Sequence, residues 1–500
     1  MIVSSAAPRP SRLFAVLAAL ALAWLGLIAW RYLGFAGYFD HGEVNVAFRA
    51  WRMVQGLPLY LLPEAPDYLL TVYGPTVYLA NGAMLGLLGG SIAASKVAGI
   101  AAAFLAVLAF GLHVRGRFGA AWIGYGLLLF LGLQMMAAPF PYWSRADPLS
   151  ILAVTLGLAA GARLAEPDRP WWAAPLAIGL CCGVAMNVKI HAFLYFFPLL
   201  IRFAARRWLW AWPLAGLAAL LALLAPFTLA AFPLGPYVAG VLKVVSVRGI
   251  ETKLLLNSLQ HILPLMAPLP LMLLALWRGR VARADALYVG ALILAILVGL
   301  YPASVAGSSW YQLIPFLPLA VDATLRMLAS LGLAPRRRDA VAWGVALLVI
   351  GLALVPQRRG LRYITERSWM GEAAAEIETV MAAHPGRPIE MGFGKDVAER
   401  YRVTFLKPML AYAGHPVTFD GWSDMEADFI GRPPSAARLE RLQDCATPLW
   451  LIPAGEEPFA MPSVFSGRDF LAPYRAVFRA RYERRQGGQY FDLWECRPVG

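Results

Sequence analysis

Charged residues are scarce in this chain. Asp, Glu, Lys and Arg make up only 15% of the 500 residues, whereas 59% are hydrophobic and the mean hydropathy is +0.59. A soluble domain has about a quarter of its residues charged and about half apolar. The composition therefore excludes an ordinary soluble protein and predicts a polytopic α-helical membrane protein.

Sequence motifs of several common enzyme classes are also missing. The chain has no Gly-x-x-x-x-Gly-Lys-Ser/Thr loop and no dinucleotide-binding glycine fingerprint, so nothing indicates ATP coupling or a nicotinamide cofactor. It has no nucleophile elbow, and no clustered His and Cys spacing of the kind that binds zinc.

Cysteine is rare, with four residues in the whole chain. Cys181 and Cys182 lie inside a hydrophobic run, which predicts packed thiols. Cys445 and Cys496 lie in the more polar tail. A disulfide between them needs an oxidising compartment, and the sequence alone leaves open whether the two are close enough.

The excess positive charge lies in the hydrophobic part of the chain. Residues 1–356 carry 25 Lys and Arg against 11 Asp and Glu, whereas residues 357–500 carry 19 of each. Basic residues in short loops between hydrophobic runs are typical of the cytoplasmic side of membrane proteins. The net charge of +14 therefore does not indicate nucleic-acid binding.

About eleven runs approach the 20 apolar residues that a spanning helix needs. They are 13–32, 95–113, 119–137, 149–165, 171–187, 190–204, 208–231, 256–277, 285–302, 311–329 and 340–356. We interpret the apolar segment 75–90 as a helix on the outer membrane face, because counting it as a span would reverse every later loop. The first outer loop then covers residues 34–94.

Basic clusters fall at every second boundary between these runs and predict a cytoplasmic N-terminus. They are Arg9 and Arg12; Arg115 and Arg117; Arg163 and Arg169; Arg202, Arg206 and Arg207; Arg278, Arg280 and Arg283; and Arg336, Arg337 and Arg338. Asp322 lies inside a run, and we expect it to pair with Arg326 one helical turn later.

After residue 356 the chain becomes polar and charge-balanced. Segment 365–383 reads as a helix, and 387–393, 448–453 and 490–494 read as strands. We therefore predict a transmembrane domain over residues 1–356 and a small extracytoplasmic α/β domain over residues 357–500. This domain recognises an acceptor, supports the outer loops or binds a partner.

Two acidic patches lie at the same predicted membrane border. Asp40 and Glu43 follow the first run, and Asp147, with Arg145 close by, follows the third. A carboxylate there can act as a general base or hold a divalent cation, and an Arg can contact a lipid phosphate through two hydrogen bonds. Alternatively, Asp40 and Asp147 cap helices, a role that is compatible with catalysis.

Further candidate binding residues lie on the same predicted side. Lys189, His191 and Arg248 add positive charge, and Tyr311 belongs to an aromatic pair. The alternatives are that Lys189 and Arg248 anchor helices at the interface, that His191 packs, and that Tyr311 belongs to an interfacial aromatic belt.

Several segments resemble GT-C glycosyltransferases, a superfamily that includes protein O-mannosyltransferases and the aminoarabinose transferases. The first outer loop resembles theirs in Asp40-x-x-Glu43, Ala50-Trp51-Arg52, Gln55-Gly56-Leu57-Pro58-Leu59-Tyr60 and Tyr73-Gly74-Pro75-Thr76-Val77-Tyr78. Later matches are Ser144-Arg145-Ala146-Asp147 and Trp310-Tyr311-Gln312-Leu313-Ile314-Pro315-Phe316-Leu317-Pro318. The resemblance covers roughly residues 10–330.

The resemblance implies an inverting transfer of a sugar from a polyprenyl-phosphate carrier on the extracytoplasmic face. Asp40 would be the general base or an acid that binds the acceptor, and Glu43 and Asp147 would support the acceptor or hold Mg²⁺ or Mn²⁺. Arg145, with Lys189 or Arg248, would stabilise the phosphate. The sequence departs from the protein O-mannosyltransferases, whose first-loop Asp and Glu are adjacent, and it has no clear Asp-x-Asp metal motif.

We therefore predict a hexosyl- or pentosyltransferase of the bacterial inner membrane, with its C-terminal domain in the periplasm. Its acceptor would be an envelope glycan, lipid or protein. One alternative is a transporter or flippase of lipid-linked sugars, for which inverted repeats and charges near the bilayer midplane are typical. The other is a non-catalytic membrane scaffold.

Overall fold

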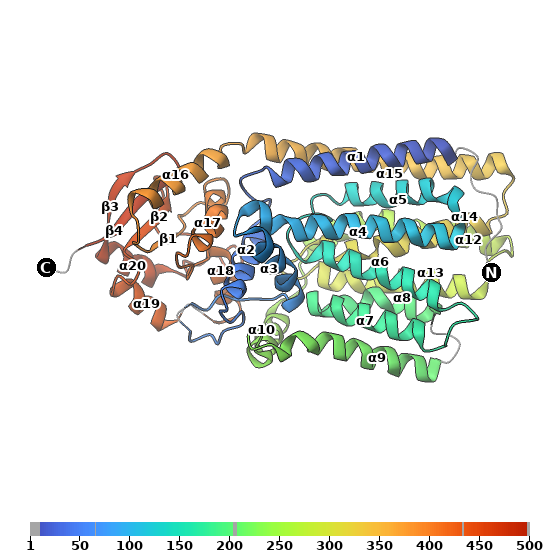
Figure 1. The fold of residues 1–500 in the computed structure, drawn as a ribbon, viewed down its shortest axis with the longest axis horizontal. Helices are drawn as coiled ribbons and strands as arrows, with labels where there is room; N and C mark the ends of the chain where they lie inside the picture. The colour runs from blue at the N-terminus through green and yellow to red at the C-terminus, as the bar shows by residue number, and fades with distance from the viewer. Residues whose placement is uncertain (1–10, 66, 204–207, 433–434, 498–500) are drawn as a thin grey trace.

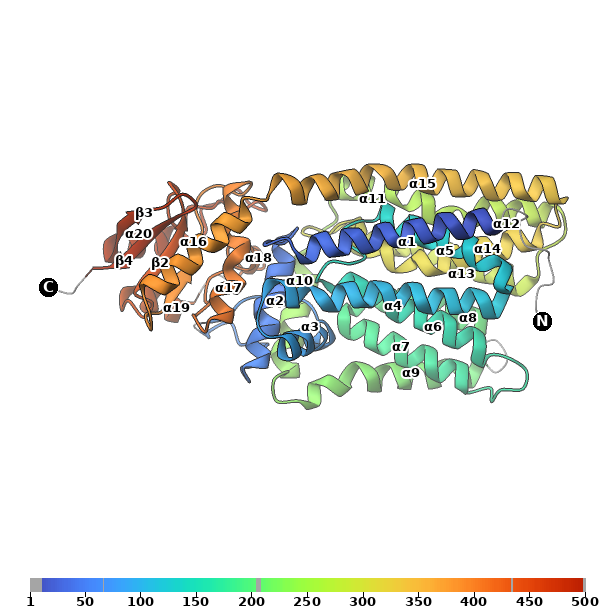
Figure 2. The ribbon, with the colours of Figure 1, turned by 45° about the horizontal axis from the view of Figure 1, so that its top comes forward.

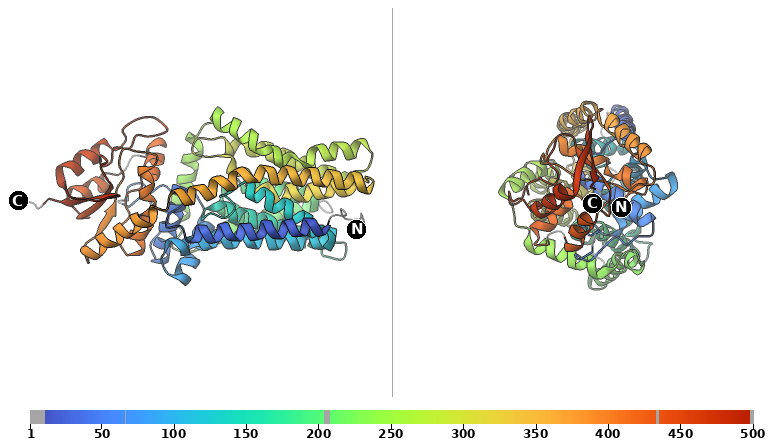
Figure 3. Two further views of the ribbon diagram at one scale, coloured as in Figure 1. Left: turned by 90° about the horizontal axis from the view of Figure 1, so that it is seen from above. Right: turned by 90° about the vertical axis from the view of Figure 1, so that its left-hand side faces the viewer.

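Long apolar runs rich in Ala and Leu form the helices of the larger part of the molecule. In the computed structural model, which describes residues 11–65, 67–203, 208–432 and 435–497, these helices run side by side as an elongated bundle (Figure 1). A smaller domain covers one end of the bundle, and the first helix begins at the other end (Figure 3). Of the basic residues that predict the orientation, Arg9, Arg206 and Arg207 lie outside the described residues.

Seven helices of the described chain are long and apolar enough to cross a membrane, or eight if one bent pair counts as a single span. The seven contain α1 (Ser11–Leu33), α4 (Ile92–Phe118), α6 (Ala146–Leu164), α9 (Trp208–Leu224), α13 (Arg283–Ala303), α14 (Leu317–Ser330) and α15 (Pro335–Glu366). The bent pair is α11 (Thr252–Ile262) with α12 (Pro268–Trp277), which meet at 48°. The protein is therefore a multi-pass membrane protein.

The predicted number of about eleven spans is not confirmed, because three of the predicted spans form shorter helices. These are α5 (Ile123–Met136), α7 (Ala173–Val188) and α8 (Phe193–Phe203). Lys189 ends α7, and a 3-10 turn over Ile190–Ala192 precedes α8. All three still pack inside the bundle, α5 against α1 and α15, and α7 against α6 and α9.

Three amphipathic or short helices lie at the end of the bundle that meets the smaller domain (Figure 2). They are α2 (His41–Val54), α3 (Pro75–Leu88) and α10 (Leu234–Val247). Helix α3 begins with Pro75, whose ring suits the first helical turn, and its 14 residues are too few to cross a bilayer. This length agrees with the prediction that segment 75–90 does not span.

A buried ion pair lies inside the bundle. Asp322 accepts a hydrogen bond of 2.6 Å from Arg326 one helical turn away, which confirms the predicted pair. His113 of α4 also lies 2.8 Å from the Asp322 carboxylate, so this acid joins two helices. The Cys181 and Cys182 thiols are free and sit within the packing of α7, as predicted.

The C-terminal domain is a four-stranded sheet surrounded by helices. The strands are β1 (Ile389–Met391), β2 (Leu449–Pro453), β3 (Tyr482–Gly487) and β4 (Phe491–Cys496), in the order β1-β2-β4-β3. Strands β1 and β2 are parallel, and the other pairs are antiparallel. The helices are α16 (Met370–Ala383), α17 (Lys407–Tyr412), α18 (Gly421–Phe429), α19 (Ala436–Gln443) and α20 (Ala472–Arg481).

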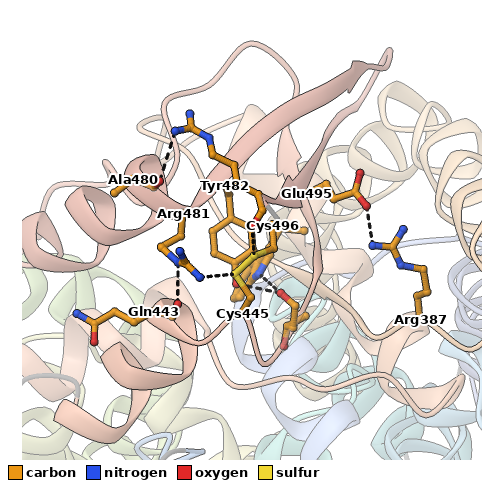
Figure 4. Close-up of a disulfide and its surroundings, with 11 residues drawn as sticks. Arg387, Gln443, Cys445, Ala480, Arg481, Tyr482, Glu495 and Cys496 are labelled. Carbon is orange, nitrogen blue, oxygen red and sulfur yellow. Dashed lines mark hydrogen bonds and ion pairs between the residues drawn. A yellow bond between two sulfur atoms is a disulfide. The ribbon is translucent and has the colours of Figure 1, made fainter. Parts of the chain in front are cut away.

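A disulfide joins Cys445, just after α19, to Cys496 at the end of β4 (Figure 4). The two Cα atoms are 6.0 Å apart. Glu495, the residue before Cys496, forms an ion pair of 2.7 Å with Arg387 (Figure 4). The structure thus resolves the question that the sequence left open, and the bond closes a long loop that contains β2, β3 and α20.

Candidate active site

A cavity of about 480 Å³ lies where the bundle meets the C-terminal domain. Its polar wall comes from α2, from the loop before α3, from Arg145 and from Lys189. Its apolar wall comes from α8, α10 and α13, and includes Phe193, Val241 and Val298. A cavity with one apolar and one charged wall suits an amphipathic ligand.

Asp40 directly precedes the cavity-lining residues His41 and Gly42 and caps α2. Its Oδ1 accepts hydrogen bonds from the Gly42 N–H at 2.6 Å and from Arg145 Nη1 at 2.8 Å. The side chain keeps 27% of its surface exposed. Burial raises the pKa of Asp40, but His41, Arg145 and the Gly42 N–H together outweigh it and lower this pKa below its usual value. Capping and a role in the site are therefore compatible, as the sequence suggested.

Glu43 is fully buried and does not line the cavity. Its carboxylate accepts hydrogen bonds from the Tyr32 hydroxyl, from the Phe39 N–H at 2.7 Å, and from the Ser144 N–H and hydroxyl at 3.0 and 3.2 Å. Burial raises the pKa of Glu43 although these donors oppose the shift. Glu43 thus joins α1, α2 and the loop before α6.

Asp147 is also fully buried, in the first turn of α6. It accepts a hydrogen bond of 2.6 Å from Lys189 Nζ and one of 2.9 Å from the Trp143 indole. The alternative that Asp147 caps this helix is wrong, because Arg145 holds the N-cap position and no side chain caps the helix. The acid instead holds the ammonium group of Lys189 at the cavity wall.

The Arg145 guanidinium connects several sides of the cavity. Besides Asp40 it donates hydrogen bonds to the Tyr73 hydroxyl at 2.6 and 3.0 Å and to the Tyr311 hydroxyl at 3.3 Å. It lies against Gly42, where a Cβ atom would come within 2.9 Å of the guanidinium carbon. Glycine at this position therefore allows Arg145 to approach the first turn of α2.

The five predicted substrate-binding residues all line the same cavity: Arg145, Lys189, His191, Arg248 and Tyr311. Lys189 Nζ also donates to Gln312 Oε1 at 2.8 Å and lies 4.7 Å from the centre of the Tyr311 ring. His191 Nε2 lies 3.2 Å from the Tyr195 hydroxyl, and Arg248 Nη2 lies 2.9 Å from Glu426 Oε1.

The acids proposed as metal ligands do not form a metal site in the described part of the chain. No group of three or more His, Cys, Asp or Glu side chains there could hold a metal ion. Glu43 and Asp147 are both fully buried, and Tyr32, Ser144, Lys189 and other protein donors bind their oxygens. These residues therefore do not fit a bound Mg²⁺ or Mn²⁺, which needs free carboxylate oxygens.

Sequence reasoning missed a row of polar residues on α2. His41, Asn45 and Arg49 all line the cavity. Their spacing of four residues places them on one face of the helix, and this spacing is a signal that the sequence does contain. Asp40 and Glu43 drew attention to the start of this helix, but its next two turns also face the cavity.

Helix α18 of the C-terminal domain forms a further wall that no sequence pattern indicated. Trp422, Ser423 and Glu426 all line the cavity. The Trp422 ring stacks on the His41 ring with centroids 3.9 Å apart. Asp420 caps α18 by accepting a hydrogen bond of 2.9 Å from the Ser423 N–H. The C-terminal domain is therefore part of the site.

Comparisons with known proteins identify the fold. No protein-family model matches the sequence, and no curated protein matches it either. The crystal structure of ArnT from Cupriavidus metallidurans bound to undecaprenyl phosphate is similar, with a TM-score of 0.58 and 15% sequence identity over 96% of this chain and 99% of that chain. The apo structure of the same protein has a TM-score of 0.58 and 14% identity over the same shares. At this level of identity the likeness concerns the fold, and the chain has the fold of the GT-C glycosyltransferases.

Proposed function

We propose that this protein is an inverting glycosyltransferase that moves a sugar from a polyprenyl-phosphate carrier to an acceptor of the cell envelope. The observation that carries this proposal is the cavity in which Arg145 and Lys189 face an apolar wall at one end of the helix bundle. A lipid phosphate needs both features, because its head is anionic and its tail is apolar. The ArnT structure, which has the same fold, was solved with undecaprenyl phosphate bound.

Arg145 and Lys189 are suited to hold the phosphate of the donor. Both side chains are nearly buried, with 8% and 3% of their surface exposed, and both remain next to the cavity. Charge-assisted hydrogen bonds in such a water-poor site stabilise a phosphate that gains negative charge as it leaves. Tyr73 and Tyr311 hold the guanidinium group in place through their hydroxyls.

In the transfer step the acceptor hydroxyl attacks the anomeric carbon of the sugar from the face opposite the phosphate. The bond between the anomeric carbon and the acceptor oxygen forms, and the bond to the phosphate oxygen breaks with its electron pair leaving on the phosphate. Asp40 accepts the proton of the acceptor hydroxyl as the general base. Its lowered pKa keeps the carboxylate ionised and therefore able to orient this hydroxyl.

Glu43 and Asp147 contribute by position in this proposal. Glu43 holds the loop that carries Arg145 through Ser144, and Asp147 holds Lys189. Both acids are fully buried and protein donors bind their carboxylate oxygens, so we assign neither of them a contact with the substrates, whereas the Asp40 side chain keeps 27% of its surface exposed. No step of the mechanism uses a metal ion.

We further propose that the site faces the outside of a bacterial inner membrane, with the N-terminus in the cytoplasm. Disulfides persist in oxidising compartments such as the periplasm. The Cys445–Cys496 bond lies in the C-terminal domain, on the same end of the bundle as the cavity. Both observations support one orientation, which also agrees with the distribution of basic residues.

The experiment that tests the proposal is sugar transfer by the purified protein from a panel of radiolabelled polyprenyl-phosphate sugars into extracted envelope material. The wild type is compared with Asp40→Asn and with Arg52→Gln, whose side chain pairs with Asp67 and lies outside the cavity. We expect transfer by the wild type and Arg52→Gln and its loss in Asp40→Asn. Equal transfer by all three proteins would exclude Asp40 as the base, and failure of the folded wild type to bind any polyprenyl phosphate would refute the donor class.

A further inference from the structure

The cationic residues of the cavity differ in whether a carboxylate pairs with them. Of the four Lys and Arg side chains that line it, three have a carboxylate partner: Arg145 pairs with Asp40 at 2.8 Å, Lys189 with Asp147 at 2.6 Å and Arg248 with Glu426 at 2.9 Å. Arg49 forms no ion pair with any described residue.

Arg49 is buried as deeply as its paired neighbours. Only 4% of its surface is exposed. Its Nη2 donates hydrogen bonds to the Leu70 carbonyl at 2.8 Å and to the Ser423 hydroxyl at 3.1 Å, whereas its Nε has no partner among the described residues. A buried charge without an opposite charge is unfavourable unless something else compensates it.

The acid Asp420 attracts Arg49 but forms no ion pair with it in the described part of the chain. Asp420 lies 3.4 Å from Lys407 Nζ and caps α18 through the Ser423 N–H. Burial raises the pKa of Asp420, but Lys407, the Ser423 N–H, His41 and Arg49 together outweigh it and lower this pKa below its usual value. Its charge is thus already matched inside the C-terminal domain.

A second unsatisfied group lies one helical turn before Arg49. The side-chain oxygen of Asn45 is buried, and no donor in the part of the chain that the structure describes forms a hydrogen bond with it. Asn45 and Arg49 lie on the same face of α2, and both line the cavity. Together they present an acceptor oxygen and a cation to a ligand. Helix α18 lies opposite them, and its Ser423 hydroxyl accepts a hydrogen bond from Arg49.

We propose that Arg49 and Asn45 form a second anion-binding subsite, which takes a phosphate or carboxylate group of the acceptor. Arg49 binds the anionic oxygens, and the Asn45 oxygen accepts a hydrogen bond from a hydroxyl or amide of the same molecule. Because Arg49 also contacts Ser423, the C-terminal domain takes part in acceptor recognition. This inference rests on the proposed function, since it assumes that the lipid phosphate of the donor binds at Arg145 and Lys189.

Phosphate binding by the purified full-length protein tests the inference. The protein in detergent micelles is first saturated with undecaprenyl phosphate, and inorganic phosphate is then titrated by calorimetry at constant ionic strength. We expect saturable binding to the wild type. Arg49→Gln should weaken it by about tenfold or more, as expected for loss of a charged hydrogen-bond donor, and leave the affinity for undecaprenyl phosphate unchanged.

Two further variants make the result specific. Arg52→Gln changes the same residue type on the same helix, but Arg52 pairs with Asp67 and lies outside the cavity, so its phosphate affinity should equal that of the wild type. Arg49→Lys keeps the charge and should bind phosphate more tightly than Arg49→Gln. It also provides a folded variant if Arg49→Gln does not fold.

Each other result overturns the inference. No saturable phosphate binding to the wild type would mean that the subsite does not exist. If Arg49→Gln weakens undecaprenyl phosphate and not inorganic phosphate, Arg49 belongs to the donor side. Failure of the proposed function looks different, because the wild type would then not bind undecaprenyl phosphate at all while inorganic phosphate binding would still depend on Arg49.

Discussion

The Lys189–Asp147 ion pair allows a test of whether a buried charge in this protein serves stability or binding. The two atoms are 2.6 Å apart, and the side chains keep only 3% and 0% of their surface exposed. With an effective dielectric constant of about 20, their attraction is about 6 kcal/mol. Removing the two ions from water costs several kcal/mol for each, so the net contribution of the pair to stability is close to zero.

Single substitutions should nevertheless be strongly destabilising, because each leaves one buried charge without its partner. Lys189→Met leaves Asp147 with only the Trp143 indole as a donor, and Asp147→Leu leaves Lys189 with Gln312. We expect each to lower the free energy of unfolding by about 3–5 kcal/mol. The double variant removes both charges and should regain stability to within about 1 kcal/mol of the wild type.

The measurement is unfolding in mixed micelles by titration with a denaturing detergent, followed by tryptophan fluorescence, for all four proteins of the double-mutant cycle. Binding of undecaprenyl phosphate is measured in parallel. The double variant should be folded and yet bind this lipid about tenfold or more weakly, because the phosphate loses a cationic partner. Additive destabilisation would show that the pair stabilises the fold, and normal binding by the double variant would exclude Lys189 from the phosphate site.

Four further predictions concern other contacts. Asp40→Asn should reduce the initial rate of transfer by about 10²- to 10⁴-fold, the usual contribution of a general base. Because the pKa of Asp40 is lowered, its contact with Arg145 should stabilise the fold above about pH 4, and this stabilisation should be lost as the pH falls through the lowered pKa. Thermal unfolding at a series of pH values measures this contribution. Its loss already at neutral pH would contradict the assignment. Replacing Cys445 and Cys496 together by Ser should destabilise the C-terminal domain by about 4 kcal/mol, because the bond joins residues 51 positions apart. Urea unfolding of the full chain measures this loss. An unchanged stability would show that the bond does not constrain the unfolded chain. Glu426→Gln removes the partner of Arg248 and should speed tryptic cleavage between the C-terminal domain and the bundle, whereas an unchanged cleavage rate would mean that the ion pair does not hold α18 in place.

The helices of the bundle and the C-terminal domain show what local sequence patterns can predict. Hydrophobic runs located the bundle helices, and short apolar segments in the polar tail located β1, β2 and β4. Strand β3 was missed because its sequence, Tyr482–Gly487, is mostly charged and exposed and pairs only at the sheet edge. The predicted number of spans is not confirmed, because a hydrophobic run records composition, whereas helix length also depends on breaks such as the one at Lys189.

For the candidate site, the sequence predicted several of the residues but not the role of each. Asp40 and Arg145 stood out because charges at a membrane border are rare and need a reason. Glu43 and Asp147 stood out for the same reason, but the sequence could not distinguish an acid that faces a cavity from one that protein donors surround. Only their burial and hydrogen bonds separate these two roles.

By itself, the sequence determined that the chain enters a membrane, where its helices lie and on which border its acids gather. These properties follow from the transfer of each segment between water and lipid, which depends on local composition. The tertiary structure alone decided which charges meet. Asp40 reaches Arg145 across 105 positions, and α18 brings Ser423 to Arg49 across 374 positions. Such pairings depend on how the whole chain packs, and one local pattern is compatible with many of them.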